Sequence, residues 1–337
     1  LPICMTNPAA TKSPAALKQI WDSAGMAVIC AAIFGLCALS VPNFASANNM
    51  SGLATAVVTV GMLSCTMLFC LASGHFDLSV GSVVACSGVL AAVVINIDSI
   101  KVFGTVYHLA PSLRITLGIA SGLLLGGLVG FVNGVIIAKL KINALITTLA
   151  TMEIVRGLAY IISNGKAVGI SQEGFFVLGI KQVGGLAMPV WIMLGCFVLF
   201  GWMIQKTVFG RSTLALGGNE EAVRLAGINV DRLKILIFSI QGVMGGFAGI
   251  VLAARMTSGQ PMTSQGLELA VISACVLGGV SLTGGVGSMV SVVSGVLIMG
   301  AVQNAMNLCN VDSFWQYVAR GGVLLAAVLF DRLKQKR

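Results

Sequence analysis

Apolar residues along this chain come in continuous runs of about 20 residues, separated by short segments rich in Gly, Asn and charged residues. Runs of that length suit an α-helix that crosses a bilayer, whereas membrane β-strands alternate over about ten residues. The pattern therefore predicts an all-α polytopic membrane protein with about ten transmembrane helices. The candidate spans are residues 26–43, 52–72, 79–97, 115–138, 142–163, 188–205, 234–254, 268–283, 286–308 and 313–330.

The third and eighth of these spans are rich in Gly and Ser. Such sequences tolerate irregular backbone, which is allowed at membrane depth only where protein buries it or water reaches it. We therefore expect broken or re-entrant helices near residues 74–98 and 268–288.

Composition agrees with a lipid environment, because 57% of the 337 residues are hydrophobic and only 9% are charged. These values exclude a water-soluble globule. The net charge of +9 suggests nucleic acid as a partner, but the distribution of the basic residues argues against it. With an even number of spans and a cytoplasmic N-terminus, 13 of the 20 Lys and Arg residues lie on the cytoplasmic side. This positive-inside asymmetry predicts that both termini are cytoplasmic.

The predicted organisation is a single transmembrane domain over residues 26–331. A polar cytoplasmic tail, residues 1–25 with turns at Pro8 and Pro14, precedes it, and a basic cytoplasmic tail, residues 332–337, follows it. A cytoplasmic loop, residues 206–234, interrupts it.

That loop is a polar island in an otherwise apolar sequence. A short helix is predicted at its centre, because Gly217 and Gly218 break the chain and Asn219 offers an N-cap. Acidic residues follow in the first turn, a basic residue can pair with the first of them at i,i+4, and a glycine supplies the left-handed C-terminal cap. These residues, with one alanine between them, are Glu220, Glu221, Ala222, Arg224 and Gly227. A two-turn helix too polar for lipid and too short to be stable alone is expected to dock onto a partner, although a solvated loop helix is the alternative.

The fourth span carries a glycine every four residues. Without a hydrophobic drive between helices in lipid, close backbone packing must hold neighbouring spans together. The stripe predicts helix packing within one subunit rather than a dimer interface. Its members are Gly118, Gly122, Gly126, Gly130 and Gly134.

Polar residues inside the spans are few. Glu153 and Arg156 lie one helical turn apart in the fifth span, and a mutually neutralising pair is the first explanation for them. Direct contact with a substrate is the alternative. Uncharged hydrogen-bonding residues that suit either a neutral sugar or helix–helix bonding are Asn133, Thr148, Thr151, Gln241 and Asn304.

Catalytic and metal-binding motifs are missing from the sequence. The chain has no P-loop, no paired histidines, no metal cluster and no nucleophile–base arrangement. We therefore expect neither enzymatic activity nor a cofactor or metal in this chain.

Two motifs carry a family resemblance. Residues 221–227, EAVRLAG, resemble the E-A-A-x-x-x-G coupling motif of ABC-importer permeases, with Val223 in place of the second alanine. Residues 77–82, DLSVGS, resemble a turn of the ribose-type monosaccharide permeases, in which Asp77 would cap the third span as a structural element. Further stretches, residues 140–170, 255–266, 272–287 and 304–308, extend the resemblance to residues 25–337.

The resemblance implies a permease subunit of an ABC importer for a monosaccharide in the bacterial inner membrane. Overall likeness favours L-arabinose over ribose, xylose or galactose. It further implies a homodimer of this chain, a separate ATPase subunit that binds ATP and Mg²⁺, and a periplasmic sugar-binding protein. The alternative from another class is a secondary sugar carrier driven by an ion gradient, with Glu153 as its proton site; a passive sugar channel is a third.

Overall fold

The computed structural model describes residues 14–102, 105–312, 314–319, 321–322 and 325. Over these residues, five helices are long and apolar enough to cross a membrane. They are α5 (Pro111–Lys139), α6 (Ala144–Ser163), α8 (Met188–Lys206), α11 (Val230–Met256) and α13 (Met289–Leu308). The protein is therefore a mostly helical polytopic membrane protein, as predicted.

The first two predicted spans differ from the structure in where the helix begins and in how straight it is. Helix α1 (Pro14–Ser40) begins at Pro14, so residues 14–25 of the predicted tail are helical. Proline suits the first turn of a helix because its missing N–H would be unpaired there anyway. The second span consists of α2 (Ala47–Ala56) and α3 (Val58–Ala72), which meet at an angle of 46°. Arg255 Nη1 donates to the carbonyl oxygen of Thr55, 2.9 Å away, and so provides a hydrogen-bond partner for a backbone carbonyl group at this bend.

The two Gly- and Ser-rich spans are short helices. Helix α4 (Val80–Ile95) has 16 residues and α12 (Leu267–Leu277) has 11. At 1.5 Å per residue, α12 is about 16 Å long, roughly half of the hydrocarbon core. Irregular chain follows α12, with Gly284 and Gly285 at positive φ. Both elements are nearly surrounded by protein, which is where short helices are tolerated at membrane depth.

Three small antiparallel ribbons were not predicted by the all-α interpretation. They pair β1 (Ser99–Val102) with β2 (Thr105–His108), β3 (Val168–Gly169) with β6 (Ser258–Gly259), and β4 (Gln182–Val183) with β5 (Leu186–Ala187). A four-residue helix, α7 (Glu173–Phe176), lies between β3 and β4. Strands of two to four residues carry too little alternation for a sequence pattern to reveal them.

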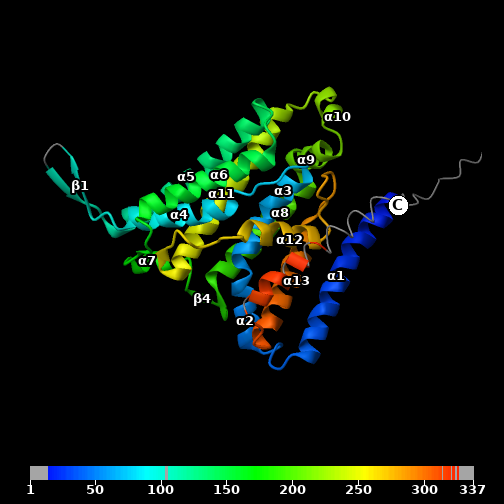
Figure 1. Cartoon of the computed structure of the whole chain (residues 1–337), viewed down its shortest axis with the longest axis horizontal. Coiled ribbons are helices and arrows are strands. Elements are labelled where there is room, and N and C mark those ends of the chain that lie inside the picture. Colours follow the sequence, from blue (N-terminus) through cyan, green and yellow to red (C-terminus); the bar gives the residue numbers. More distant parts are fainter. Residues whose placement is uncertain (1–13, 103–104, 313, 320, 323–324, 326–337) are drawn as a thin grey trace, which may run out of the picture.

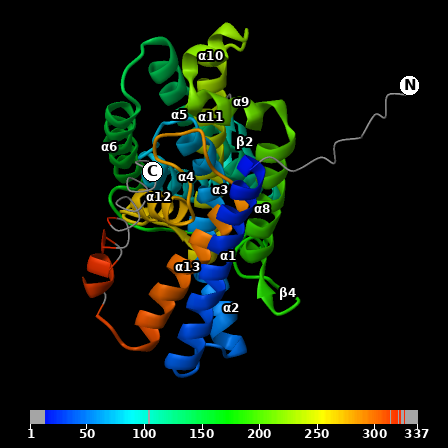
Figure 2. The ribbon, with the colours of Figure 1, turned by 90° about the vertical axis from the view of Figure 1, so that its right-hand side faces the viewer.

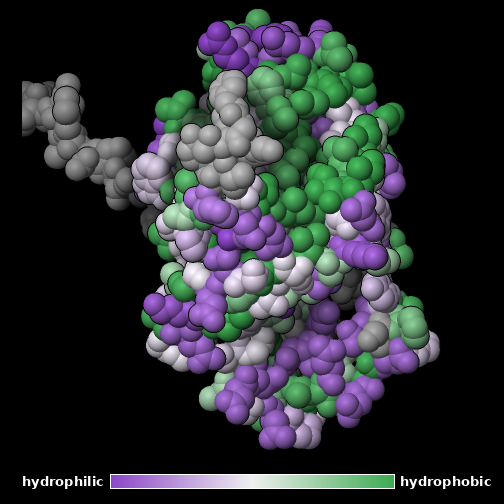
Figure 3. Space-filling model, turned by 90° about the vertical axis from the view of Figure 1, so that its left-hand side faces the viewer, coloured by the Kyte–Doolittle hydropathy of each residue, from purple (hydrophilic) through white to green (hydrophobic). Residues whose placement is uncertain are grey.

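Figures 1 and 2 show how the ends of the molecule differ. Helices α9 (Val208–Gly218) and α10 (Glu220–Leu225) lie at one end in both views, and α2 and the β4–β5 ribbon lie at the other. In Figure 3, hydrophilic residues cover the end that carries α10, and a hydrophobic surface lies next to them.

The glycine stripe of α5 packs inside the chain. A Cβ atom at Gly126 or Gly130 would collide with the backbone of α11, and one at Gly118 would collide with Ile95 of α4. Gly122 lies against Ile250 and Ser87, and Gly134 lies against Ile235. Close approach of the α4, α5 and α11 backbones therefore depends on these small residues, as the membrane packing rule predicts.

Half of the tenth predicted span, residues 313–330, lies outside the described residues, and residues 1–13 and 332–337 of the predicted tails lie wholly outside them. Residues 314–319 are helical, and the large side chains of Phe314 and Trp315 are exposed.

Candidate functional site

The short helix predicted at residues 219–227 is present as α10. Asn219 is its N-cap, and its side-chain oxygen accepts a hydrogen bond of 3.0 Å from the backbone N–H of Ala222. Gly227 follows the helix with φ of +81°, a left-handed conformation that glycine adopts without strain. Gly217 and Gly218 differ from expectation, because they end α9 rather than lie in a loop. A side chain at Gly217 would collide with the carbonyl oxygen of Ala72, so this position requires glycine for packing.

Glu220 anchors α10 to the N-terminal part of α11. Its carboxylate lies 3.1 Å from Arg224 Nη2, the expected i,i+4 pair, and 2.8 Å from Lys234 Nζ. The hydrogen bond from Lys234 lowers the pKa of the Glu220 carboxyl below its ordinary value, and Arg224 adds to the effect. Val223 is buried beneath the helix. The buried Val223 and the Glu220–Lys234 ion pair therefore attach α10 to the membrane domain.

None of the described residues covers the outer face of α10. Glu221, Ala222 and Leu225 are exposed, and Leu225 has 81% of its surface accessible. Leu225 was not among the predicted site residues, although a leucine within a polar loop is a sequence feature that could have indicated it. An isolated apolar side chain between charges, on a rigid helix, has the composition of a protein-docking site.

A polar cavity of about 550 Å³ opens beside α10. It is lined by the connection between α3 and α4, the connection between α5 and α6, and the N-terminal part of α11. His75 lies in its wall, where burial lowers the pKa of the imidazole and the nearby Lys234 ammonium lowers it further. Its Nδ1 is 2.8 Å from the carbonyl oxygen of Ser73 and is positioned to donate to it. Charged groups around the cavity are Lys141, Glu220, Arg224, Asp231 and Lys234.

A buried hydrogen-bond chain connects this region to two spans. Thr151 of α6 donates to Asn133 Oδ1 of α5 over 2.7 Å, and Asn133 Nδ2 donates to Ser79 Oγ over 3.1 Å. The hydroxyl of Ser79 donates in turn to Asp77 Oδ1 over 2.6 Å. Ser79, not Asp77, is therefore the N-cap residue of α4, and Asp77 orients it through the turn. Asn133 and Thr151, predicted to suit either a sugar or helix–helix bonding, thus link α6 and α5 to the start of α4, and their contact with a sugar stays a prediction.

The predicted Glu153–Arg156 ion pair is wrong. Arg156 Nη1 donates to the carbonyl oxygens of Pro261 and Thr263, each 2.8 Å away. Glu153 is exposed on the outer face of α6, and the ion pairs found among the described residues do not include it. The irregular chain before α12 leaves the carbonyl groups of Pro261 and Thr263 free to accept, and the geometry of the fold directs the Arg156 guanidinium toward them rather than toward Glu153.

The remaining uncharged candidates do not meet in one cavity. Thr148 donates to the Ala144 carbonyl of its own helix, and Asn304 exchanges two hydrogen bonds with Asn49. Gln241 is fully buried, and neither its amide nitrogen nor its oxygen has a partner among the described residues. In that part of the chain, no group of His, Cys, Asp and Glu is arranged to hold a metal ion.

Comparison of the sequence with protein-family models identifies the family to which this chain belongs. A model described as the branched-chain amino acid transport system permease component matches residues 49–328. The chain belongs to this permease family. A polytopic permease of this family is a multi-pass protein of the bacterial inner membrane, and permease subunits of this kind are not catalytic.

Relatives within this permease family have more specific names. The chain is 58% identical to the L-arabinose transport system permease protein AraH of Escherichia coli K12, over 97% of this chain and 95% of the relative. It is 50% identical to the L-arabinose ABC transporter permease protein AraH of Azospirillum brasilense, over 98% and 95%. The ribose import permease protein RbsC of Escherichia coli K12 is 37% identical, over 87% and 88%. No solved structure matches the chain.

Proposed function

We propose that this chain is the membrane permease of an ABC importer for L-arabinose. The observation that carries the proposal is the identity of 58% to the L-arabinose permease of Escherichia coli, against 37% to the ribose permease of the same bacterium. Both alignments cover most of this chain, so the difference reflects the whole transmembrane domain and not one motif.

Helix α10 is the proposed coupling element to a separate ATPase subunit, which holds ATP and Mg²⁺. A rigid helix that is capped, ion-paired to α11 and exposed at Glu221, Ala222 and Leu225 can transmit a push from outside into the α11 span. This assignment places the α9–α10 end and both termini in the cytoplasm, with residues 26–331 as one permease domain of about ten spans.

A second copy of the chain is the proposed cover for the outer face of α6. Only 22% of the apolar window of this helix is buried, and Glu153 lies exposed at its middle. A carboxylate at the centre of a span costs at least about 2.5 kcal/mol unless water or a polar partner reaches it. If Glu153 faces a polar pathway between two protomers, water or sugar hydroxyls there can solvate its carboxylate. Polar walls of this kind also provide the hydrogen bonds that a neutral sugar needs.

The proposed homodimer can be tested by disulfide formation. In a cysteine-free background, Ile154→Cys on the exposed face of α6 is expected to cross-link two protomers, while Val198→Cys on α8 is not. Both positions are exposed within one chain, at 63% and 74%. Cross-linking at Val198 alone would refute the α6 interface.

Reconstitution tests the function. Proteoliposomes with this chain, its ATPase and an L-arabinose-loaded binding protein are expected to accumulate sugar only with ATP. Ribose-loaded and galactose-loaded binding proteins serve as specificity controls. Uptake by this chain alone under a pH step would instead support an ion-gradient carrier, a class that the permease family membership disfavours.

A further inference from the structure

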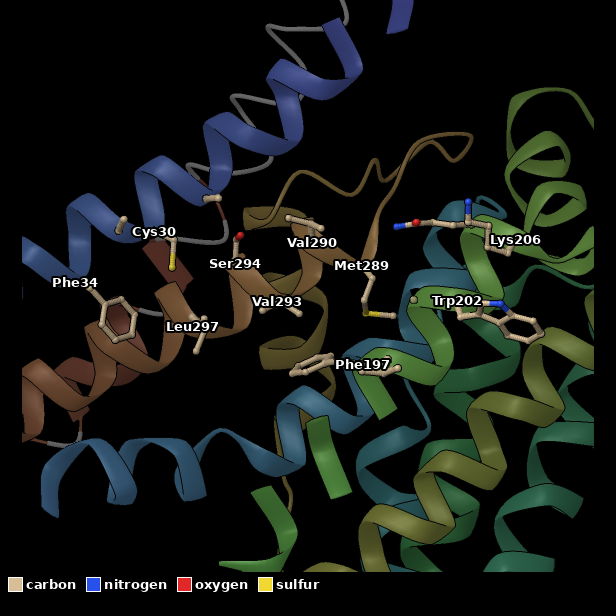
Figure 4. Close-up of a pocket in the computed structure, with 15 residues that line it drawn as sticks. Cys30, Phe34, Phe197, Trp202, Lys206, Met289, Val290, Val293, Ser294 and Leu297 are labelled. Carbon is tan, nitrogen blue, oxygen red and sulfur yellow. The ribbon is translucent and has the colours of Figure 1, made fainter. Parts of the chain in front are cut away.

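An apolar groove of about 770 Å³ opens on the side of the molecule between α1, α8 and α13. Figure 4 shows Phe34 and Leu297 toward one end, with Val293, Met289 and Phe197 along its middle. These side chains offer almost no hydrogen-bonding groups, so neither water nor a sugar gains by filling the groove.

The other end of the groove is cationic. Figure 4 shows Trp202 and Lys206 together at this end, and both belong to the last turns of α8. Arg211 is not in the lining but lies close to this end, because its Nη1 donates to the main-chain carbonyl oxygen of Lys206 over 3.3 Å. Neither cation has an acidic partner in the ion pairs found over the described part of the chain.

The position of the two ends relative to the membrane limits what can occupy the groove. Lys206 ends a membrane span, and α9 and α10 follow it at one end of the molecule, where Figure 3 shows hydrophilic residues. The cations therefore lie at the level of lipid headgroups, a tryptophan lies at the interface where it is favoured, and the apolar part lies within the hydrocarbon. An acyl chain fits the apolar part, and an anionic headgroup fits the cations.

We propose that this groove is a binding site for an anionic phospholipid of the cytoplasmic leaflet. One acyl chain lies along Phe34, Val293 and Leu297, and the phosphate group contacts Lys206 and Arg211. Basic pockets between transmembrane helices on the cytoplasmic side bind such headgroups in general. The proposal rests on the cytoplasmic orientation of α9 and α10, and it requires neither a particular sugar nor the α6 dimer face, since α6 and α1 lie on different sides of the molecule (Figures 1 and 2).

Tryptophan quenching in vesicles tests the site directly. A variant of the full chain that keeps Trp202 alone, with Trp21, Trp191 and Trp315 changed to Phe, is reconstituted in phosphatidylcholine. Brominated phosphatidylglycerol or brominated phosphatidylcholine is then added at increasing mole fraction. Because an interfacial cation contributes about 1 kcal/mol to anionic lipid binding, phosphatidylglycerol is expected to quench at about fivefold lower mole fraction per engaged cation.

Two further variants separate the site from general membrane charge. Lys206→Gln is expected to reduce the preference for phosphatidylglycerol about fivefold. Lys139→Gln, which removes an exposed cation from the last turn of α5, should leave the preference unchanged. Filling the groove with Ala31→Phe should weaken quenching by both lipids.

Equal quenching by the two lipids, or a preference that survives in Lys206→Gln, would overturn the proposal. A Trp202 that neither lipid quenches would also overturn it, because the groove would then be covered by a second copy or by the C-terminal residues of this chain. The readout involves no sugar, so failure of L-arabinose uptake would leave the result intact.

Discussion

Leu225 provides the sharpest test of the coupling role of α10. Its side chain is 81% exposed, so it contributes almost nothing to the fold of this chain. Complete burial of a leucine side chain contributes about 1.5–3 kcal/mol, and most of that remains available to a partner. Leu225→Ala is therefore expected to weaken ATPase binding by about 1–2 kcal/mol, which is a 5- to 30-fold rise in Kd.

The stability of the permease itself should not change. A surface substitution away from buried groups shifts stability by no more than about 0.5 kcal/mol, so the thermal midpoint in detergent should match that of the parent chain. The matched control is Leu39→Ala, because Leu39 is 89% exposed but lies in the last turn of α1, at the opposite end of the molecule from α10.

Binding of the purified ATPase subunit to permease-containing nanodiscs gives the Kd directly. Transport-coupled ATP hydrolysis, measured in parallel, should fall with the loss of binding. An unchanged Kd in Leu225→Ala, or an equal loss in Leu39→Ala, would refute the docking argument. A fall in thermal midpoint would show that Leu225 supports the fold of this chain instead.

Three further predictions test other contacts. Gly130→Ala should prevent folding or strongly lower the yield of assembled protein, because its Cβ would collide with the α11 backbone, whereas Gly157→Ala meets open space and should be tolerated. Arg156→Gln should lower the thermal midpoint, since it releases two carbonyl groups at about 1–3 kcal/mol each, while Glu153→Gln should leave the midpoint unchanged. The changes in thermal midpoint should be additive in the double variant. Strong coupling between the two substitutions would instead indicate that Glu153 and Arg156 form an ion pair. Because the pKa of His75 is lowered on folding, its protonation opposes the fold, so thermal stability should decrease as pH falls below about 6.5, and His75→Gln should remove that part of the pH dependence.

Several features of this chain follow from local sequence alone. Apolar runs of the length of a bilayer require helices, since lipid offers no partner for backbone groups. The caps and the i,i+4 pair of α10 involve residues within one or two turns of each other, and the structure contains both the Asn219 cap and the Glu220–Arg224 contact. A glycine every fourth residue in α5 likewise requires a close neighbour, because nothing else explains so many missing side chains on one face.

The identity of each partner depended on the tertiary structure. The sequence places Arg156 one turn from Glu153, but a broken segment more than 100 residues away supplies two carbonyl groups with better geometry. Lys234 similarly joins Glu220 from 14 positions along the chain, and Asn133 finds Ser79 from 54. Helical spacing predicts contacts between residues three or four apart. Contacts between distant segments depend on how the spans pack against one another, and the free backbone groups and cavities that this packing creates leave no periodic trace in the sequence.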